Sequence, residues 1–107
     1  MISEDDAERA VDWLRDHAAQ IGKARAERLY MEQWIKTVKA TLQAEQGDTS
    51  VAAAEVAALS SPKYLSALQA YREAIQADET FRFLATAAEA KVEFWRSSEA
   101  SRRAGLK

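Results

Sequence analysis

Chain breakers are the scarcest feature of this sequence, since only three glycines and one proline occur in 107 residues. Sheets need many turns, and turns draw heavily on glycine and proline. The rest is rich in alanine, glutamate, lysine, arginine and leucine, which favour helices. The composition therefore predicts a single all-α domain over residues 1–107 and leaves little room for an all-β or α/β fold.

Local signals divide the chain into three helices, expected at about residues 3–46, 51–59 and 61–104. Ser3 is a suitable N-cap for the first helix, and Asp6, three residues later, completes a sequence that resembles a capping box. Gly47 suits the position after its last turn. Asp48, Thr49 or Ser50 is expected to cap the short alanine-rich helix, and Ser61 followed by Pro62 begins the third.

Two long helices around a turn predict an antiparallel hairpin of coiled-coil type, with paired residue numbers that sum to about 108. Large apolar residues suggest that the contact stripe shifts phase at 24–30 and again at 78–84. The first helix shows one stripe before the shift and another after it: Ala7, Val11, Leu14, Ala18 and Ile21, then Met31, Trp34 or Ile35, Val38 and Leu42. The third helix behaves alike, with Tyr64, Leu68, Tyr71 and Ile75, then Phe81, Leu84, Ala88, Val92 and Trp95.

Aromatic residues exceed what a two-helix seam can bury, because the chain has three Trp, three Tyr and three Phe. We expect a second subunit to cover them and predict a homo-oligomer. The alternative is a bundle folded within one chain, with a helix break near Gly22. The residues predicted at the oligomer interface are Trp13, Trp34, Ile35, Val38, Leu84, Val92 and Trp95.

Charge is segregated along the chain although the formal net charge is only −2. Residues 1–16 carry six carboxylates against two arginines, whereas 17–43 and 82–107 each carry three more cations than carboxylates. A hairpin places the acidic start beside the basic end, so these charges favour an antiparallel orientation.

The basic segment also has an aromatic component, which is typical of surfaces that bind single-stranded nucleic acid. Cations contact phosphates there and rings stack on bases. The candidate residues are Lys23, Arg25, Arg28, Tyr30, Trp34, Lys36 and Lys39. An acidic isoelectric point of about 5.4 argues against tight general binding.

Other chemistry finds little support in the sequence. The chain has no Cys and a single histidine, His17, which gives no basis for thiol catalysis or a multi-histidine metal site. No glycine-rich phosphate loop or nucleophile elbow occurs. We therefore expect no enzyme, no cofactor and no metal. No apolar run approaches 18 residues and the start is acidic, so we expect a cytoplasmic protein without a signal peptide or membrane contact.

The C-terminal segment Val92-Glu93-Phe94-Trp95-Arg96-Ser97-Ser98-Glu99-Ala100-Ser101-Arg102-Arg103-Ala104 resembles the ending of small helical accessory proteins of temperate phages and prophages. The segments at 71–74 and at 23–30 are also similar to the sequences of these phage proteins. The resemblance implies an accessory protein in the host cytoplasm that acts around DNA recombination, replication or packaging, and it implies no catalytic residue.

Three functions remain open on this evidence. The first is a non-enzymatic accessory protein that associates with itself and with an unidentified protein partner through its helices. The second is a single-stranded nucleic-acid binder that uses the basic aromatic segment. The third is a phage inhibitor whose acidic face at 4–16 mimics nucleic acid against a host protein.

Overall fold

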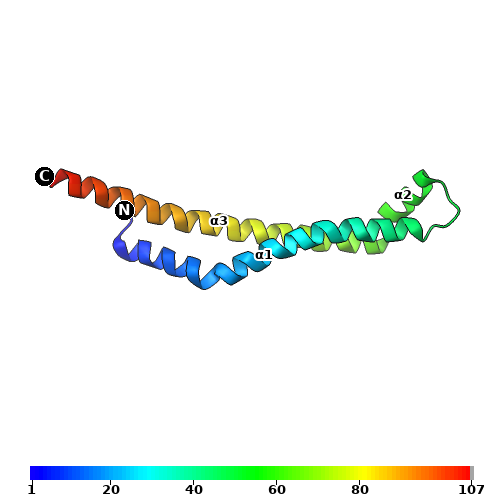
Figure 1. Ribbon diagram of the computed structural model, residues 1–107, viewed down its shortest axis with the longest axis horizontal. Coiled ribbons are helices and arrows are strands. Elements are labelled where there is room, and N and C mark those ends of the chain that lie inside the picture. The colour runs from blue at the N-terminus through cyan, green and yellow to red at the C-terminus, as the bar shows by residue number, and fades with distance from the viewer. Residues whose placement is uncertain (107) are drawn as a thin grey trace. The chain divides into compact units, whose positions relative to one another are not determined.

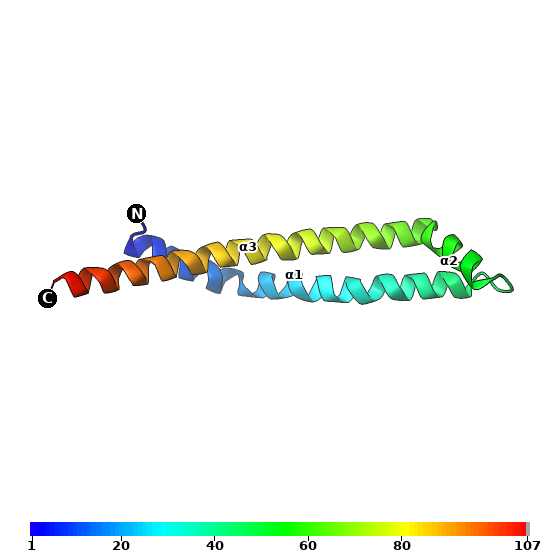
Figure 2. The ribbon, with the colours of Figure 1, turned by 90° about the horizontal axis from the view of Figure 1, so that it is seen from above.

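The computed structural model describes residues 1–106, which form three α-helices in this range: α1 (Glu4–Ala44), α2 (Val51–Leu59) and α3 (Pro62–Gly105). The prediction of an all-α helical hairpin is confirmed, and each helix begins and ends within two residues of the expected position. A turn and α2 connect α1 to α3, which runs in the opposite direction (Figures 1 and 2).

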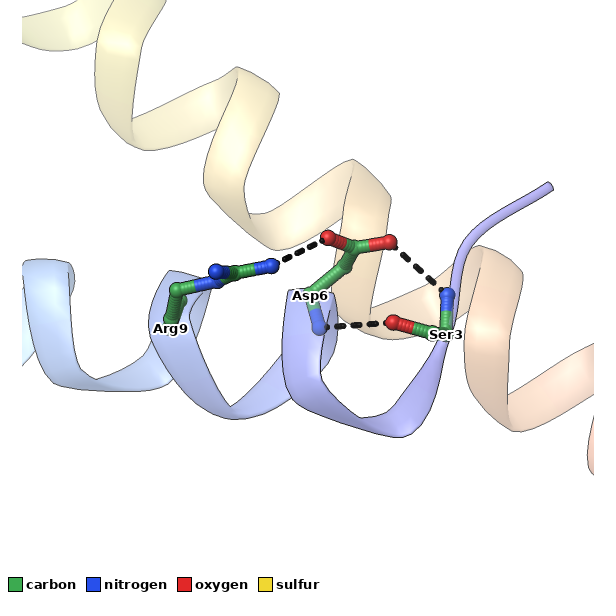
Figure 3. Close-up of polar contacts among 3 residues, drawn as sticks. All are labelled: Ser3, Asp6 and Arg9. Carbon is green, nitrogen blue, oxygen red and sulfur yellow. Dashed lines mark hydrogen bonds and ion pairs between the residues drawn. The ribbon is translucent and has the colours of Figure 1, made fainter.

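A reciprocal capping box begins α1, as the sequence predicts (Figure 3). The Asp6 backbone N–H donates to Ser3 Oγ over 3.1 Å, and the Ser3 N–H donates to Asp6 Oδ2 over 2.9 Å. Arg9 Nη2 also donates to Asp6 Oδ1 over 2.9 Å. These contacts, with the backbone bond from Ser3 the largest, lower the pKa of Asp6 to about 2.

Glycine and serine define the turn between the long helices. Gly47 has a φ of 64°, a left-handed conformation that follows naturally after a helix end. Ser50 caps α2, because its Oγ accepts a 3.1 Å hydrogen bond from the Ala53 N–H. Ser61 precedes Pro62 at the start of α3, and its Oγ accepts from the Lys63 N–H at 3.3 Å.

The chain divides into two compact units, each of which contains parts of α1 and α3. Among the residues that the structure describes, the terminal unit comprises 1–22 and 79–106, and the central unit is Lys23–Asp78. The divisions fall at Gly22 and Asp78, yet both helices continue through these residues without a break. The two helices of the terminal unit lie side by side and antiparallel in Figure 1, and those of the central unit do so in Figure 2.

On each long helix a series of buried and half-buried residues recurs at alternating spacings of three and four, which is the heptad pattern of a coiled-coil seam. On α1 the seam positions are Ala7, Ala10, Leu14, His17, Ile21, Ala24, Arg28, Met31, Ile35, Val38 and Leu42. On α3 they are Tyr64, Ala67, Tyr71, Ala74, Asp78, Phe81, Ala85, Ala88, Val92, Trp95 and Glu99.

This continuous pattern corrects the phase shifts expected from the sequence. Several large residues assigned to the stripes are exposed instead: Val11 by 48%, Leu68 by 44% and Leu84 by 48%. Small neighbours occupy the seam in their place, as Ala67 does beside Leu68. The stripes looked broken because charged residues, Arg28 and Asp78, hold seam positions.

Alanine dominates the core of both units. Seven of the nine buried apolar residues are alanines, and only Met31 and Leu42 are larger. Within residues 1–106 no large side chain is fully buried. Small seam residues allow two helices to approach closely, but they leave the bulky side chains at the sides of the seam rather than within it.

Candidate interaction surfaces

An ion pair lies inside the seam of the central unit. Arg28 Nη1 donates to Asp78 Oδ2 over 3.1 Å, although the two residues are fifty positions apart in the chain. Asp78 is only 8% exposed, and the Arg28 side chain is 33% exposed. Burying a carboxylate is costly unless it is paired, so Arg28 serves the hairpin itself.

The same ion pair sets the register between α1 and α3. The residue numbers of the pair sum to 106, which is two less than the sum expected from the sequence. Counting by heptads from this pair places Met31 level with Ala74, and Val38 level with Ala67. Each of these layers joins one large residue to one alanine, which keeps the spacing of the helices even.

A groove of about 590 Å³ runs along one side of the seam in the central unit. Its floor is made by seam residues such as Met31, Val38 and Leu42, and its walls come from α1 and α3. The α3 wall consists largely of small residues: Ser66, Ala67 and Ala70. Only two charged residues line it, Glu45 and Lys63. Because its floor is apolar and the residues of its α3 wall are small, the groove can accommodate an inserted aromatic or aliphatic side chain.

Beside this groove, α1 carries a second heptad stripe, whose spacing of four and three repeats that of the seam. All its members are exposed, and we call them the side stripe: Lys23, Glu27, Tyr30, Trp34, Thr37 and Thr41. Tyr30 and Trp34 stack at its centre, with ring centroids 6.5 Å apart and planes 8° from parallel. They are 61% and 43% exposed. A heptad stripe is the pattern by which one helix packs against another.

The opposite side of the central unit is partly covered by α2. Lys39 Nζ contacts Glu55 Oε1 of α2 at 3.1 Å, and Ala58 of α2 is fully buried. Near the start of α3 this side also has a shallow apolar hollow around Leu65, Leu68 and Ile75. The central unit thus has one side occupied in part by its own short helix and another side that is open.

The terminal unit has smaller hollows beside its seam. One is lined by Ala10, Trp13, Leu84 and Lys91, with a volume of about 350 Å³. The Trp13 ring stacks on the His17 imidazole at 4.4 Å, and His17 Nδ1 lies 2.8 Å from the Trp13 carbonyl oxygen. His17 is therefore held at the seam by its own helix.

The residues predicted to bind nucleic acid do not form one surface. Lys23, Tyr30 and Trp34 lie on the side stripe, whereas Arg25 and Lys36 are exposed on other sides of α1. The remaining two cations are in ion pairs: Arg28 with Asp78 and Lys39 with Glu55.

The residues predicted at an oligomer interface fall into two groups. Ile35, Val38, Val92 and Trp95 are half-buried seam residues within the hairpin. By contrast, Trp13, Trp34 and Leu84 lie beside the seam, where they wall the grooves. Asp78, Thr37, Thr41 and Ala70 were not predicted as interaction residues from the sequence. The spacing of Thr37 and Thr41 from Trp34 is the signal that places the first two on the side stripe.

Half of the carboxylates at the acidic start of α1 form ion pairs within the helix. Asp12 contacts Arg15 at 3.2 Å, and Asp16 contacts the same arginine at 3.3 Å. With Asp6 bound to Arg9, three of the six carboxylates at 1–16 have a cation on their own helix.

Residues 1–106 contain no cluster of three or more histidine, aspartate or glutamate side chains arranged to hold a metal ion. None of the helices they form has an apolar stretch long enough to cross a membrane.

The fold and the seam define an antiparallel α-helical hairpin of coiled-coil type with an open groove beside its seam. No family model matches the chain, and no curated protein or solved structure is detectably similar to it.

Proposed function

We propose that this chain is a non-enzymatic protein that acts by associating with itself and with a protein partner through its helices. The setting that we propose is that of a phage or prophage accessory protein, on the resemblance of the segment at 92–104. The proposed function rests on the surface of the hairpin and does not depend on that setting.

The observation that carries the proposal is the distribution of large apolar residues. In the described chain none is fully buried, whereas many are exposed, among them Leu29, Tyr30, Trp34, Phe83 and Phe94. The accessible surface is 7864 Å², against about 5,900 Å² for a typical folded monomer of this mass. The excess is comparable to what one subunit contributes to an obligate interface, which totals about 2,000–5,000 Å².

Light scattering coupled to size exclusion tests this proposal at low and high salt. The expected result is a multiple of 11.9 kDa that persists at high salt, because apolar burial is insensitive to screening. A mass of 11.9 kDa at every concentration tested would remove self-association from the proposal.

Single-stranded nucleic-acid binding is a second candidate, supported by the exposed Tyr30–Trp34 stack on the same stripe as Lys23. Rings and cations on one surface are what such binding requires. The test is salt-dependent binding of a fluorescent oligonucleotide, with loss of affinity in Tyr30→Ala and Lys23→Glu. Binding that is absent, or equal in these variants, argues against it.

A further inference from the structure

We infer that the groove of the central unit receives the side stripe of a second copy of this chain, so that the two α1 helices pack antiparallel about a twofold axis near Trp34. This inference rests on the proposed self-association and specifies the surface and the geometry. Three features of the central unit support it: the pattern of the stripe, the size of the groove residues and the order of the charges.

The stripe has the periodicity that a helix interface needs. Lys23 and Trp34 belong to the stripe, and Glu45 lies in the groove beyond its end. The three residues are spaced eleven positions apart, with Trp34 at the midpoint. A twofold axis at Trp34 therefore brings Lys23 of one copy level with Glu45 of the other, twice in the dimer. Isologous interfaces need this kind of self-complementarity.

The charges on the groove agree with those on the stripe. Glu45 and Lys63 are the charged residues that line the groove at one end. Lys23 and Glu27 are the charged residues at the far end of the stripe. In the antiparallel arrangement the partner's Lys23 lies level with Glu45, and the level of Lys63 falls between the partner's Lys23 and Glu27. The contact of Lys23 with Glu45 joins opposite charges and occurs twice, which favours this orientation and register.

The sizes of the side chains also match. The register set by Arg28 and Asp78 places the partner's Tyr30 level with Ala67, where Ser66, Ala67 and Ala70 leave room for a large ring, and the twofold axis brings the two Trp34 side chains level with each other. Aromatic side chains seated in pockets of small residues supply most of the binding energy in many interfaces. The result is a four-helix arrangement built from the central units of two copies.

A second copy is preferred to a foreign helix because the chain itself carries the complement of its own groove. A foreign helix would need an aromatic residue flanked by a cation and a carboxylate in the same order. The side stripe of α1 already has these features, and its six members are exposed.

Charge reversal tests the inference directly through the dimer dissociation constant, measured by sedimentation equilibrium on the full chain. Lys23→Glu and Glu45→Lys each place two like-charge contacts in the dimer, and each is expected to weaken it about tenfold. The double variant Lys23→Glu/Glu45→Lys restores opposite charges at both contacts and is expected to dimerise within about threefold of the wild type.

Lys36→Glu is the matched control, because it changes the net charge as Lys23→Glu does on an exposed site of α1 outside the stripe. It should leave the constant unchanged. The two single reversals change net charge in opposite directions, so a general charge effect cannot weaken both. Far-UV circular dichroism checks that each exposed-site variant keeps its helices.

The outcomes separate the inference from the function on which it rests. A wild-type dimer that is indifferent to both single reversals, or a double variant as weak as the singles, overturns this interface and leaves self-association by another surface. A monomeric wild type overturns both. A monomer that binds oligonucleotide through Tyr30 and Trp34 assigns the stripe to nucleic acid instead.

Discussion

Arg28 and Asp78 meet at the same level of the seam, with Nη1 3.1 Å from Oδ2, although most other seam positions of the long helices are apolar. Any slip of α3 along α1 would leave the largely buried Asp78 carboxylate beside an apolar layer. The pair thus opposes alternative registers, as a buried polar group does in other coiled coils.

Removing one partner of this pair should destabilise the hairpin, whereas removing both should not. Arg28→Leu leaves Asp78 without its partner in the seam and is expected to lower the free energy of unfolding by about 2 kcal/mol. The double variant Arg28→Leu/Asp78→Leu should be at least as stable as the wild type, because an apolar layer replaces the ion pair. Urea unfolding followed by circular dichroism measures both. A double variant less stable than Arg28→Leu would contradict this account.

The small seam residues should resist enlargement. Ala74 is 6% exposed and lies level with Met31, so Ala74→Leu forces the helices apart and is expected to cost about 1–3 kcal/mol. Ala90→Leu makes the same change at an exposed position of α3 and should change stability by no more than about 0.5 kcal/mol. Thermal unfolding compares the two variants, and equal effects would show that Ala74 does not lie in a packed seam.

The start of α1 should respond to acid through Asp6. Because the folded-state pKa of Asp6 is lowered to about 2 from 3.8, the capping box stabilises the first turn fully above about pH 4. This contribution is lost as pH falls from about 4 through 2. The protection of the first-turn amides of α1, taken relative to the intrinsic exchange rate at each pH, is expected to fall over that window in the wild type. In Asp6→Asn the first-turn amides should be less protected at neutral pH, and their protection should no longer change between about pH 4 and 2. Glu8→Gln is the control and should keep the wild-type pH dependence.

The attachment of α2 should depend on Ala58 rather than on the surface ion pair. At nine residues α2 is too short to persist alone, and Ala58 is its fully buried contact. Ala58→Leu is expected to release α2 and to remove the protection of its amides from exchange. Lys39→Ala breaks the exposed contact with Glu55 and should change stability by less than about 1 kcal/mol. Intact protection in Ala58→Leu would contradict this packing.

The helix ends could be predicted because each depends on a local signal. The signals are Ser3 with Asp6, Gly47, and Ser61 with Pro62. Each acts within one helical turn, so residues close in sequence decide where the helix begins or ends. The cap of α2 was narrowed to three residues, of which the structure selects Ser50.

The face of each helix was harder to predict, because side-chain size misled the assignment. Leu68 and Leu84 are apolar but exposed, while the neighbouring alanines Ala67 and Ala85 take the seam. Which of the two is buried depends on the distance between the helices, and that distance is a property of the whole hairpin. Arg28 was assigned to nucleic acid because its partner, Asp78, is remote in the chain.

The proposed interface joins two copies through α1 in an antiparallel register with Lys23 beside Glu45. Its most direct test mixes the Lys23→Glu chain with the Glu45→Lys chain and counts the dimers by native mass spectrometry. Each homodimer has like charges at both contacts, whereas the heterodimer has opposite charges at both. We expect the heterodimer to exceed the statistical half of all dimers. A statistical mixture, or no dimer in the wild type, would contradict it.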